Sequence, residues 1–208
     1  MNNNMENKLI IITSWDDYCE ENYRMAELLK KYKLPGIFFL PTERPLVDFC
    51  AKQIEDLADQ GFKIGCHTKT HPLDLKILDN HQLKSEIKDC RKQLQEMANQ
   101  EINWFCYPRG RYDLRVKNVV IGTGFKYART TKILNIKPSE DNFEIKTAIH
   151  VGCARKEYGD KDWLIVAFEL FDKAMKKENS VFHLWGHGWE IAKFNQWEKL
   201  ERLLKYLA

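Results

Sequence analysis

The feature that most constrains the fold of this chain is a regular alternation between short apolar runs and longer segments with helical periodicity. Runs such as "LIIIT" and "IFFL" have the β-branched and aromatic composition of buried strands. The predicted strands cover residues 8–14, 37–40, 62–66, 103–107, 125–129, 146–152 and 180–187, and the predicted helices cover 19–32, 47–60, 81–99, 113–122, 162–177 and 191–207. Residues 131–145 are predicted to form a loop.

This alternation is typical of parallel strands joined by right-handed crossovers, arranged either as an open doubly wound sheet or as a barrel. Neither G-x-G-x-x-G nor G-x-x-x-x-G-K-[ST] follows any predicted strand, so the nucleotide-binding form of the open sheet loses its main support. No repeat, low-complexity tract or linker divides the chain. The sequence therefore predicts a single α/β barrel domain over residues 1–208.

Composition excludes several classes of function. The 208 residues are 44% hydrophobic and 12% aromatic, which is enough to bury a substantial core as one domain. The net charge is only +3, because 33 basic and 30 acidic residues are interspersed, so no block of charge favours nucleic acid or an anionic membrane. The apolar runs are too short to span a bilayer, and "MNNNMENK" lacks the apolar core of a signal peptide. We expect a cytoplasmic protein.

Cysteine usage agrees with this location. Six cysteines are scattered along the chain without a C-x-x-C motif, which favours reduced thiols over a disulfide framework. They are Cys19, Cys50, Cys66, Cys90, Cys106 and Cys153.

Polar clusters follow the predicted strands at the point where each strand ends. Asp16 and Asp17 come directly after the first strand, and His67 and His71 follow the third. "YPRGRY" follows the fourth strand, and His187 ends the seventh. In a β/α barrel the carboxyl ends of the strands form one rim, where function is located. We therefore expect these side chains to lie close together.

The residue types in these clusters suit a hydrolytic metal site. Two imidazoles and one carboxylate leave open positions on zinc, so that a bound water can be activated. Because successive residues leaving a strand point in different directions, one aspartate of an adjacent pair can bind the metal while the other serves as a base. The alternative for Asp16 and Asp17 is a helix N-cap.

The motifs of this chain resemble those of a known family. "TSWDDY", "GCHTKTHP", "FCYPRGRYD", "GDKDW" and "FHLWGHGWEI" are similar, in order, to the five motifs of the polysaccharide deacetylase family, also called the NodB-homology domain or carbohydrate esterase family 4. The resemblance runs from about residue 8 to 191, and its most specific part is H-[ST]-x-x-H-P. It implies a distorted, TIM-like (β/α)7 barrel.

The resemblance also implies an activity and a set of roles. The family hydrolyses acetyl groups on sugars and polysaccharides, with N-acetyl preferred here over O-acetyl, and so acts on C–N bonds other than peptide bonds. Asp17, His67 and His71 would hold one divalent metal, with zinc preferred, and Asp16 would be the base. Two alternatives stay open: a related barrel hydrolase acting on a non-sugar amide, and a non-catalytic carbohydrate-binding barrel.

The third motif departs from the common family pattern. Cys106 stands where many members have an arginine, whose usual partner, the aspartate of the fourth motif, is present as Asp162. Either Arg109, Arg111 or Arg129 replaces the missing arginine, or Asp162 has another role.

The fifth motif offers two histidines for the acid that protonates the leaving group. His187 is favoured because it lies nearer the carboxyl end of the strand, whereas His183 is interpreted as a hydrogen-bonded histidine inside the barrel.

Substrate contacts are predicted from the residues that flank the motifs. Tyr107, Arg109, Trp163 and Trp185 are the predicted substrate-binding residues, and Trp15 and Trp189 flank the same motifs. Aromatic faces suit the C–H surfaces of sugars. A backbone N–H of the "YPRG" turn, that of Arg109, is predicted to stabilise the oxyanion.

Overall fold

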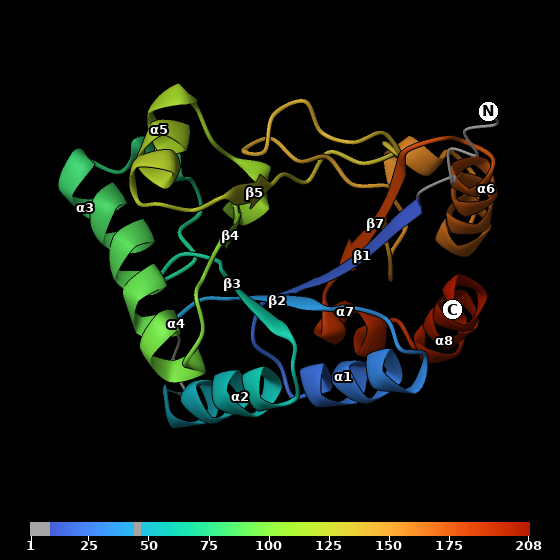
Figure 1. The fold of residues 1–208 in the computed structure, drawn as a ribbon, viewed down its shortest axis with the longest axis horizontal. Helices are drawn as coiled ribbons and strands as arrows, with labels where there is room; N and C mark the ends of the chain where they lie inside the picture. The colour runs from blue at the N-terminus through green and yellow to red at the C-terminus, as the bar shows by residue number, and fades with distance from the viewer. Residues whose placement is uncertain (1–8, 44–46) are drawn as a thin grey trace, which may run out of the picture.

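The chain folds around one curved parallel sheet. The computed structural model describes residues 9–43 and 47–208. Within these residues seven strands pair in the order β5-β4-β3-β2-β1-β7-β6 (Figure 1). Their bounds are β1 Leu9–Asp16, β2 Ile37–Leu40, β3 Lys63–Cys66, β4 Trp104–Cys106, β5 Tyr127–Arg129, β6 Ile149–His150 and β7 Ser180–Gly186. The predicted distorted barrel of seven parallel strands is confirmed.

Helices surround the outside of the sheet. Figure 1 shows α1 beside α2, α3 near α5, and α6 with α8 next to β7. The helices are α1 Glu21–Lys31, α2 Val47–Asp59, α3 Asn80–Lys84, α4 Cys90–Ala98, α5 Leu114–Gly122, α6 Trp163–Met175, α7 Gly188–Lys193 and α8 Trp197–Leu207. Short turns are η1 Leu75–Ile77, the π-helical η2 Ser85–Asp89, η3 Pro108–Gly110 and η4 Lys156–Tyr158. None of the described helices is both long enough and apolar enough to cross a membrane.

The distortion of the barrel lies between its edge strands, β5 and β6. The irregular segment 130–148 fills this gap, as predicted for residues 131–145, and Figure 1 shows it crossing from β5 towards β7. The amide of Ile145 donates to the carbonyl of Ala128 in β5 at 2.9 Å, and the amide of Ala148 donates to His183 in β7 at 2.8 Å. Irregular backbone therefore takes the hydrogen bonds that a further strand would take.

Two predicted elements differ clearly from the observed ones at the end of the chain and in the sixth strand. The predicted helix 191–207 is two helices, α7 and α8, because Asn195 between them has a left-handed φ of 49°. The sixth strand is shorter than the predicted 146–152, since Gly152, with φ at 104°, turns the chain away from the sheet. Lys8, where the first strand was predicted to begin, lies outside the described residues.

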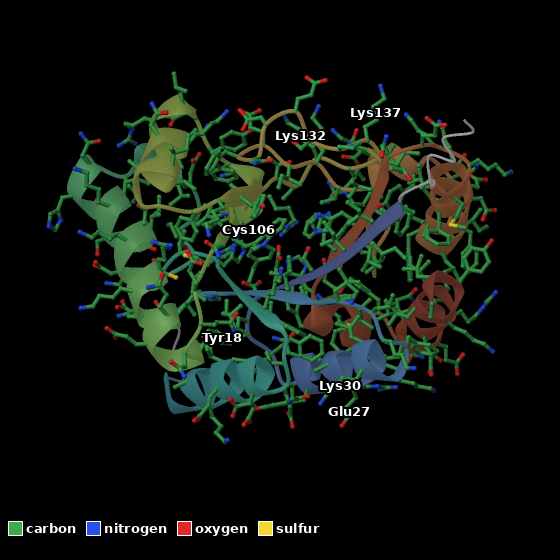
Figure 2. The ribbon with its side chains drawn as sticks, in the orientation of Figure 1. Tyr18, Glu27, Lys30, Cys106, Lys132 and Lys137 are labelled. Carbon is green, nitrogen blue, oxygen red and sulfur yellow. The ribbon has the colours of Figure 1, made fainter. Side chains whose placement is uncertain are left out.

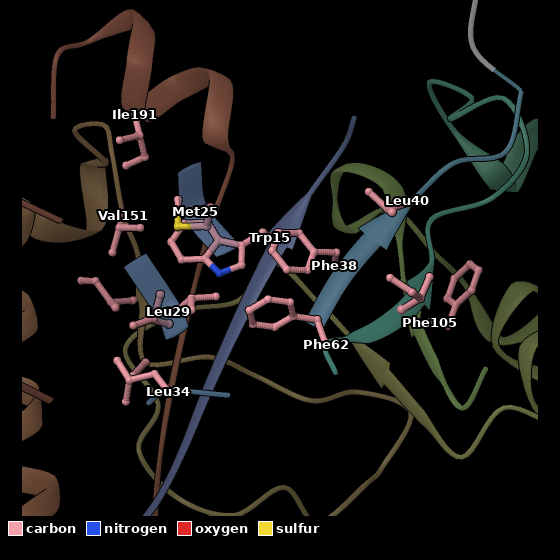
Figure 3. Close-up of a cluster of buried hydrophobic side chains, with 14 of the residues drawn as sticks. Trp15, Met25, Leu29, Leu34, Phe38, Leu40, Phe62, Phe105, Val151 and Ile191 are labelled. Carbon is pink, nitrogen blue, oxygen red and sulfur yellow. The ribbon is translucent and has the colours of Figure 1, made fainter. Parts of the chain in front are cut away.

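The core packs tightly against the inner strands. Trp15, next to the end of β1, is fully buried, and its indole N–H donates to the hydroxyl of Thr13 at 3.2 Å. Figure 3 shows Trp15 near Phe38 and Phe62, whose rings meet edge to face at 5.4 Å. Burial of one such aromatic side chain contributes about 1.5–3 kcal/mol. This packing fixes the end of β1, where Asp16 and Asp17 leave the strand.

The thiol prediction is confirmed for the described cysteine side chains. Five cysteines are free, and the prediction for Cys50 concerns a side chain outside the described part.

Candidate active site

The carboxyl ends of three strands bring the predicted site residues to one place. Asp16 ends β1, His67 follows β3, and His187 follows β7. Ligand atoms of Asp17, His67 and His71 all lie within 4.8 Å of one another. Cys106, labelled in Figure 2, ends β4, and its sulfur lies within 4.8 Å of ligand atoms of Asp16 and His67. The topology thus gathers residues more than a hundred positions apart in sequence.

The backbone of this site is strained. Asp17, Thr68 and His71 have φ values of 70°, 67° and 54°, in the left-handed region that non-glycine residues rarely adopt. Such residues persist only where the surroundings over-determine them, and they cluster at functional sites. The amide of Asp17 is anchored by donating to the carbonyl of Phe39 in β2 at 3.1 Å.

His67 is oriented by the neighbouring strand. Its Nδ1 lies 2.9 Å from the carbonyl oxygen of Cys106 and must donate there, because a carbonyl only accepts. Nε2 therefore keeps its lone pair available as a ligand. Burial lowers the pKa of His67, despite the nearby carboxylates, and favours the neutral imidazole that metals require. The ring of His71 is 4.7 Å away, and its Nε2 is 3.9 Å from Asp17 Oδ1.

The loop that carries both histidines is held by one carboxylate. Glu86 accepts from the amides of Lys69 and Thr70 at 2.9 and 3.0 Å and from the Thr70 hydroxyl at 2.7 Å. The Thr68 hydroxyl accepts from the amide of His71 at 3.1 Å and closes the loop onto its own backbone. Glu86 belongs to η2, and π-helical turns of this kind are frequent at functional sites.

Asp16 has a different environment from Asp17. Its Oδ2 forms a fully buried ion pair with Arg129, while Oδ1 has no hydrogen-bond partner in the part of the chain that the structure describes. Burial opposes ionisation of Asp16, but the charge and hydrogen bond of Arg129, together with His67 and His187, leave the pKa below its usual value. Asp16 is thus an ionised carboxylate with one oxygen held and one available.

Arg129 reaches the site from the strand next to Cys106. Cys106 and Arg129 are register partners on the neighbouring strands β4 and β5, so the guanidinium enters at the same level of the sheet from one strand further along. Its Nη2 donates to the Cys106 sulfur at 2.7 Å, and its guanidinium carbon lies 4.4 Å from the centre of the Trp185 ring. The small thiol leaves room for this side chain.

Asp162 has another role. Its Oδ1 accepts from the amide of Leu164 at 2.9 Å and caps α6, and its Oδ2 pairs with Lys199. Arg111 donates to the carbonyl of Leu73 at 3.2 Å. Of the three predicted replacements, Arg129 is the one that reaches the site, and it contacts Asp16 and not Asp162.

The two histidines of the fifth motif differ sharply. His187 Nδ1 is 2.6 Å from Glu190 Oε2. Burial lowers the pKa of His187, but the Glu190 hydrogen bond and the charge of Asp16 outweigh it, so the pKa is raised. His183 is buried inside the barrel, with Nε2 2.8 Å from the Ser14 hydroxyl, and burial lowers its pKa to about 3. His187 is therefore the histidine that can carry a proton near neutral pH.

Sequence reasoning missed Glu190 and His150. One oxygen of Glu190 contacts His187, and the same oxygen lies 3.0 Å from His150 Nε2. The available signal was the spacing of three residues between His187 and Glu190, which places two side chains on one face at a helix start. For His150 the sequence offers no comparable signal.

Several predicted substrate contacts need correction. Tyr107, Trp163 and Trp185 are buried, and the Tyr107 hydroxyl donates to the carbonyl of Phe143 at 3.1 Å. Tyr107 and Trp163 pack into the hydrophobic core, whereas Trp185 is buried against the site residues Arg129 and His187. Trp15 is buried as well. Trp189 is 38% exposed, and its ring centre lies 5.2 Å from that of His187.

Arg109 has an exposed side chain and lies in the tight turn η3 with φ at 56°. In this turn the amides of Tyr107, Gly110 and Arg111 donate to backbone carbonyls, and Pro108 has no N–H. The amide of Arg109 has no acceptor among the described residues. A Cβ at Gly110, which has φ at 68°, would lie 2.1 Å from the Thr131 hydroxyl oxygen, so this turn requires glycine.

Comparison with known proteins decides the family. A sequence model of the family described as Polysaccharide deacetylase matches residues 2–128. The chain belongs to the polysaccharide deacetylase family. YxkH of Bacillus subtilis, whose name assigns it to the polysaccharide deacetylases, is 30% identical over 128 residues, which are 60% of this chain. That match spans only 45% of the length of YxkH.

Solved structures of low sequence identity share the fold. A Mycobacterium smegmatis protein, also named as a polysaccharide deacetylase, aligns with a TM-score of 0.73 at 12% identity, covering 97% of this chain and 84% of its own. BA3943 of Bacillus anthracis, described as a pseudoenzyme of carbohydrate esterase family 4, aligns with a TM-score of 0.62 at 17% identity, covering 95% of this chain and 61% of its own. The fold is therefore shared by at least one member without activity.

Proposed function

We propose that this protein is a metal-dependent hydrolase that removes acetyl groups, N-acetyl in preference to O-acetyl, from a sugar or polysaccharide. The observation that carries the proposal is the division between two adjacent aspartates. Asp17 lies with His67 and His71 in a compact donor set, while Asp16 is held by Arg129 with one oxygen available. A ligand and a base are the two roles that metal-assisted hydrolysis needs.

The donor set fits a divalent ion. Two imidazoles and one carboxylate are the ligands of hydrolytic zinc sites, and the Nδ1 contact of His67 leaves Nε2 as its donor. When bound, such an ion would lower the pKa of a water and polarise the acetyl carbonyl. The ion's identity follows from ligand chemistry, which favours zinc over the harder magnesium.

Asp16 would take a proton from the attacking water at Oδ1. Arg129 keeps the carboxylate ionised and fixes its orientation through Oδ2, so the carboxylate needs no rearrangement to accept the proton. The carbonyl oxygen of the acetyl group becomes an oxyanion, and the unpaired amide of Arg109 is proposed as its backbone donor.

His187 would give its proton to the leaving nitrogen. Glu190 engages Nδ1, which leaves Nε2 to donate, and the raised pKa maintains the imidazolium that an acid must be. The C–N bond breaks as the amine accepts this proton. The products are acetate, which takes the oxygen of the water, and a free amino sugar.

The two alternatives to this proposal are a non-catalytic binding barrel and an enzyme that acts on a non-sugar amide. The fold of BA3943 shows that family likeness alone does not establish catalysis. A binding barrel, however, has no use for an ionised buried aspartate opposite a histidine of raised pKa, and this pairing favours an enzyme. A non-sugar amide as substrate would use the same base and acid.

A substrate screen tests the proposal. The zinc-loaded protein is incubated with N-acetylglucosamine oligomers, O-acetylated sugars and simple N-acetyl amides, and mass spectrometry detects loss of an acetyl group. We expect loss from the N-acetylated sugars with the wild type and not with Asp16→Asn. Loss from simple amides alone would favour the non-sugar alternative, and no loss from any compound would favour the binding barrel.

A further inference from the structure

A second group of side chains that could bind a metal ion lies next to His187. His150 ends β6, Cys153 follows in the next turn, and Glu190 belongs to α7. One ligand atom from each lies within 4.8 Å of the other two. This group belongs to none of the metal or base positions above, and it falls beyond residue 128, where the match to the family model ends.

The side chain of Tyr158 fixes the backbone of His150. The hydroxyl of Tyr158 accepts from the amide of His150 at 2.9 Å and donates to its carbonyl at 2.7 Å. The imidazole packs against Trp185, with ring centres 4.1 Å apart. Cys153 is brought beneath α7 by the turn at Gly152, where a Cβ would lie 2.9 Å from Ile191 Cδ1. The ligands are therefore positioned before any ion binds.

The group is compact enough to close around one small cation. Cys153 Sγ is 3.5 Å from His150 Nδ1, and Glu190 Oε2 is 3.0 Å from His150 Nε2, so the two contacts use different nitrogens of the imidazole. An imidazole binds one ion through one nitrogen, and with one ligand atom from each residue the three donors lie within 4.8 Å of one another. Donors around a tetrahedral zinc ion stand roughly 3.3–3.8 Å apart, from metal–ligand bonds of about 2.0–2.3 Å. A side-chain rotation would bring the three donors to these separations.

The Nε2 atom of His150 faces the carboxylate of Glu190. His150 is 3% exposed, and its Nε2 lies 3.0 Å from Glu190 Oε2 without the geometry of a hydrogen bond. The same Glu190 oxygen also contacts His187 Nδ1, so two imidazoles share one acceptor. A cation bound by His150 and Glu190 would replace this imperfect contact with metal–ligand bonds.

We propose that His150, Cys153 and Glu190 form a second cation site for zinc or another thiol-binding divalent ion. A thiolate and a carboxylate together neutralise the double charge, and the sulfur selects against magnesium and calcium. Without the ion, burial and the charge of Glu190 raise the pKa of the Cys153 thiol to about 11. Binding therefore releases the thiol proton.

The site is joined to His187 through a shared carboxylate. Glu190 Oε2 also lies 2.6 Å from His187 Nδ1, so an ion on Glu190 competes with the hydrogen bond that holds His187. This link to catalysis rests on the proposed function, but the cation site itself does not.

Cobalt binding tests the site because it reports thiolate ligands directly. Co²⁺ bound to a thiolate gives an intense ultraviolet charge-transfer band, and Co²⁺ bound by aspartate and histidine alone does not. The full chain is titrated with Co²⁺. We expect the wild type to show this band, Cys153→Ser to lose it, and the half-buried control Cys19→Ser to keep it. His67→Ala should lose one equivalent of cobalt and retain the band.

Several results would overturn the inference. A wild type that binds cobalt without the band has no thiolate site. A band that persists in Cys153→Ser, or disappears in His67→Ala, would assign the thiolate to Cys106, whose sulfur lies near Asp16 and His67. Zinc added to the cobalt-loaded wild type should bleach the band, which repeats the test on the unaltered chain.

Discussion

Two neighbouring aspartates behave differently because only one of them faces a buried guanidinium. Arg129 neutralises Asp16 inside the barrel, where an unpaired carboxylate would cost several kcal/mol. Asp17, one residue later, adopts a left-handed φ that turns it towards His67 and His71. The division of labour between the two carboxylates is therefore set by one residue of backbone conformation and one arginine.

Substitution should separate the two roles. Asp16→Asn keeps the volume of the side chain but cannot accept the proton, so we expect zinc to be retained and kcat to fall by roughly two to four orders of magnitude. Asp17→Asn should instead weaken zinc binding. Elemental analysis and turnover of an N-acetylated sugar measure both. If the two phenotypes were exchanged, Asp17 would be the base.

The acid should leave a mark on the pH profile. Because the Glu190 hydrogen bond raises the pKa of His187, the protonated acid persists to higher pH, and activity falls only as pH rises through that pKa. Glu190→Gln removes the carboxylate that raises the pKa of His187, so the basic limb of kcat should move to lower pH. In His187→Ala the limb should vanish. If the basic limb is unchanged in Glu190→Gln, Glu190 does not set the pKa of the acid. His183→Ala is the matched control, and it should keep the basic limb of the wild type.

At the residue scale, the sequence predicted the ligand and base positions as a family resemblance but could not select Arg129. The choice among Arg109, Arg111 and Arg129 depends on strand register, which pairs Cys106 with Arg129 and which no local pattern encodes. The burial of Tyr107 and Trp163 was not predicted for a related reason. A motif places an aromatic residue near the site but does not show whether its side chain faces the core.

At the scale of elements, the site depends on how a π-helical turn meets a loop. The predicted helix 81–99 is interrupted by η2, and this interruption presents Glu86 to the amides of Lys69 and Thr70. Helical periodicity in the sequence shows no break here, since the extra residue of a π turn shifts the register without changing composition. The break between α7 and α8 has a different cause, the left-handed φ of Asn195.

Removal of this carboxylate should loosen the metal ligands. Glu86→Ala leaves two amides without their acceptor, and loss of such supporting contacts typically weakens metal affinity by about 10- to 100-fold. We expect weaker zinc binding, with turnover restored at high zinc concentration. Glu96→Ala is the control, because Glu96 is exposed on α4 and, among the described residues, pairs only with Lys92 at 3.8 Å. If Glu86→Ala and Glu96→Ala bind zinc with equal affinity, the conformation of the loop does not depend on Glu86.

At the scale of the whole molecule, the alternation of strands and helices was enough to predict the barrel, but not how it closes. Between β5 and β6 the closure uses the irregular segment 130–148, whose hydrogen bonds are set by tertiary contacts and not by local propensity. The consequence is a barrel whose site residues come from strands far apart in sequence, with Asp16 at the end of β1, His67 after β3 and His187 after β7. The ligand set therefore exists only when the sheet is assembled.

Zinc should accordingly stabilise the entire fold. A ligand that binds only the native state at 100 times its dissociation constant adds about 2.7 kcal/mol. For a chain of this size each kcal/mol raises Tm by about 2–4 °C, so the expected shift is roughly 5–11 °C. Cys153→Ser provides the parent for this measurement because only the first site then contributes. Calorimetry should show the shift in Cys153→Ser and none when His67→Ala is added. An equal shift in both would mean that zinc stabilises the fold through ligands other than the Asp17, His67 and His71 set, since the double variant lacks one member of that set.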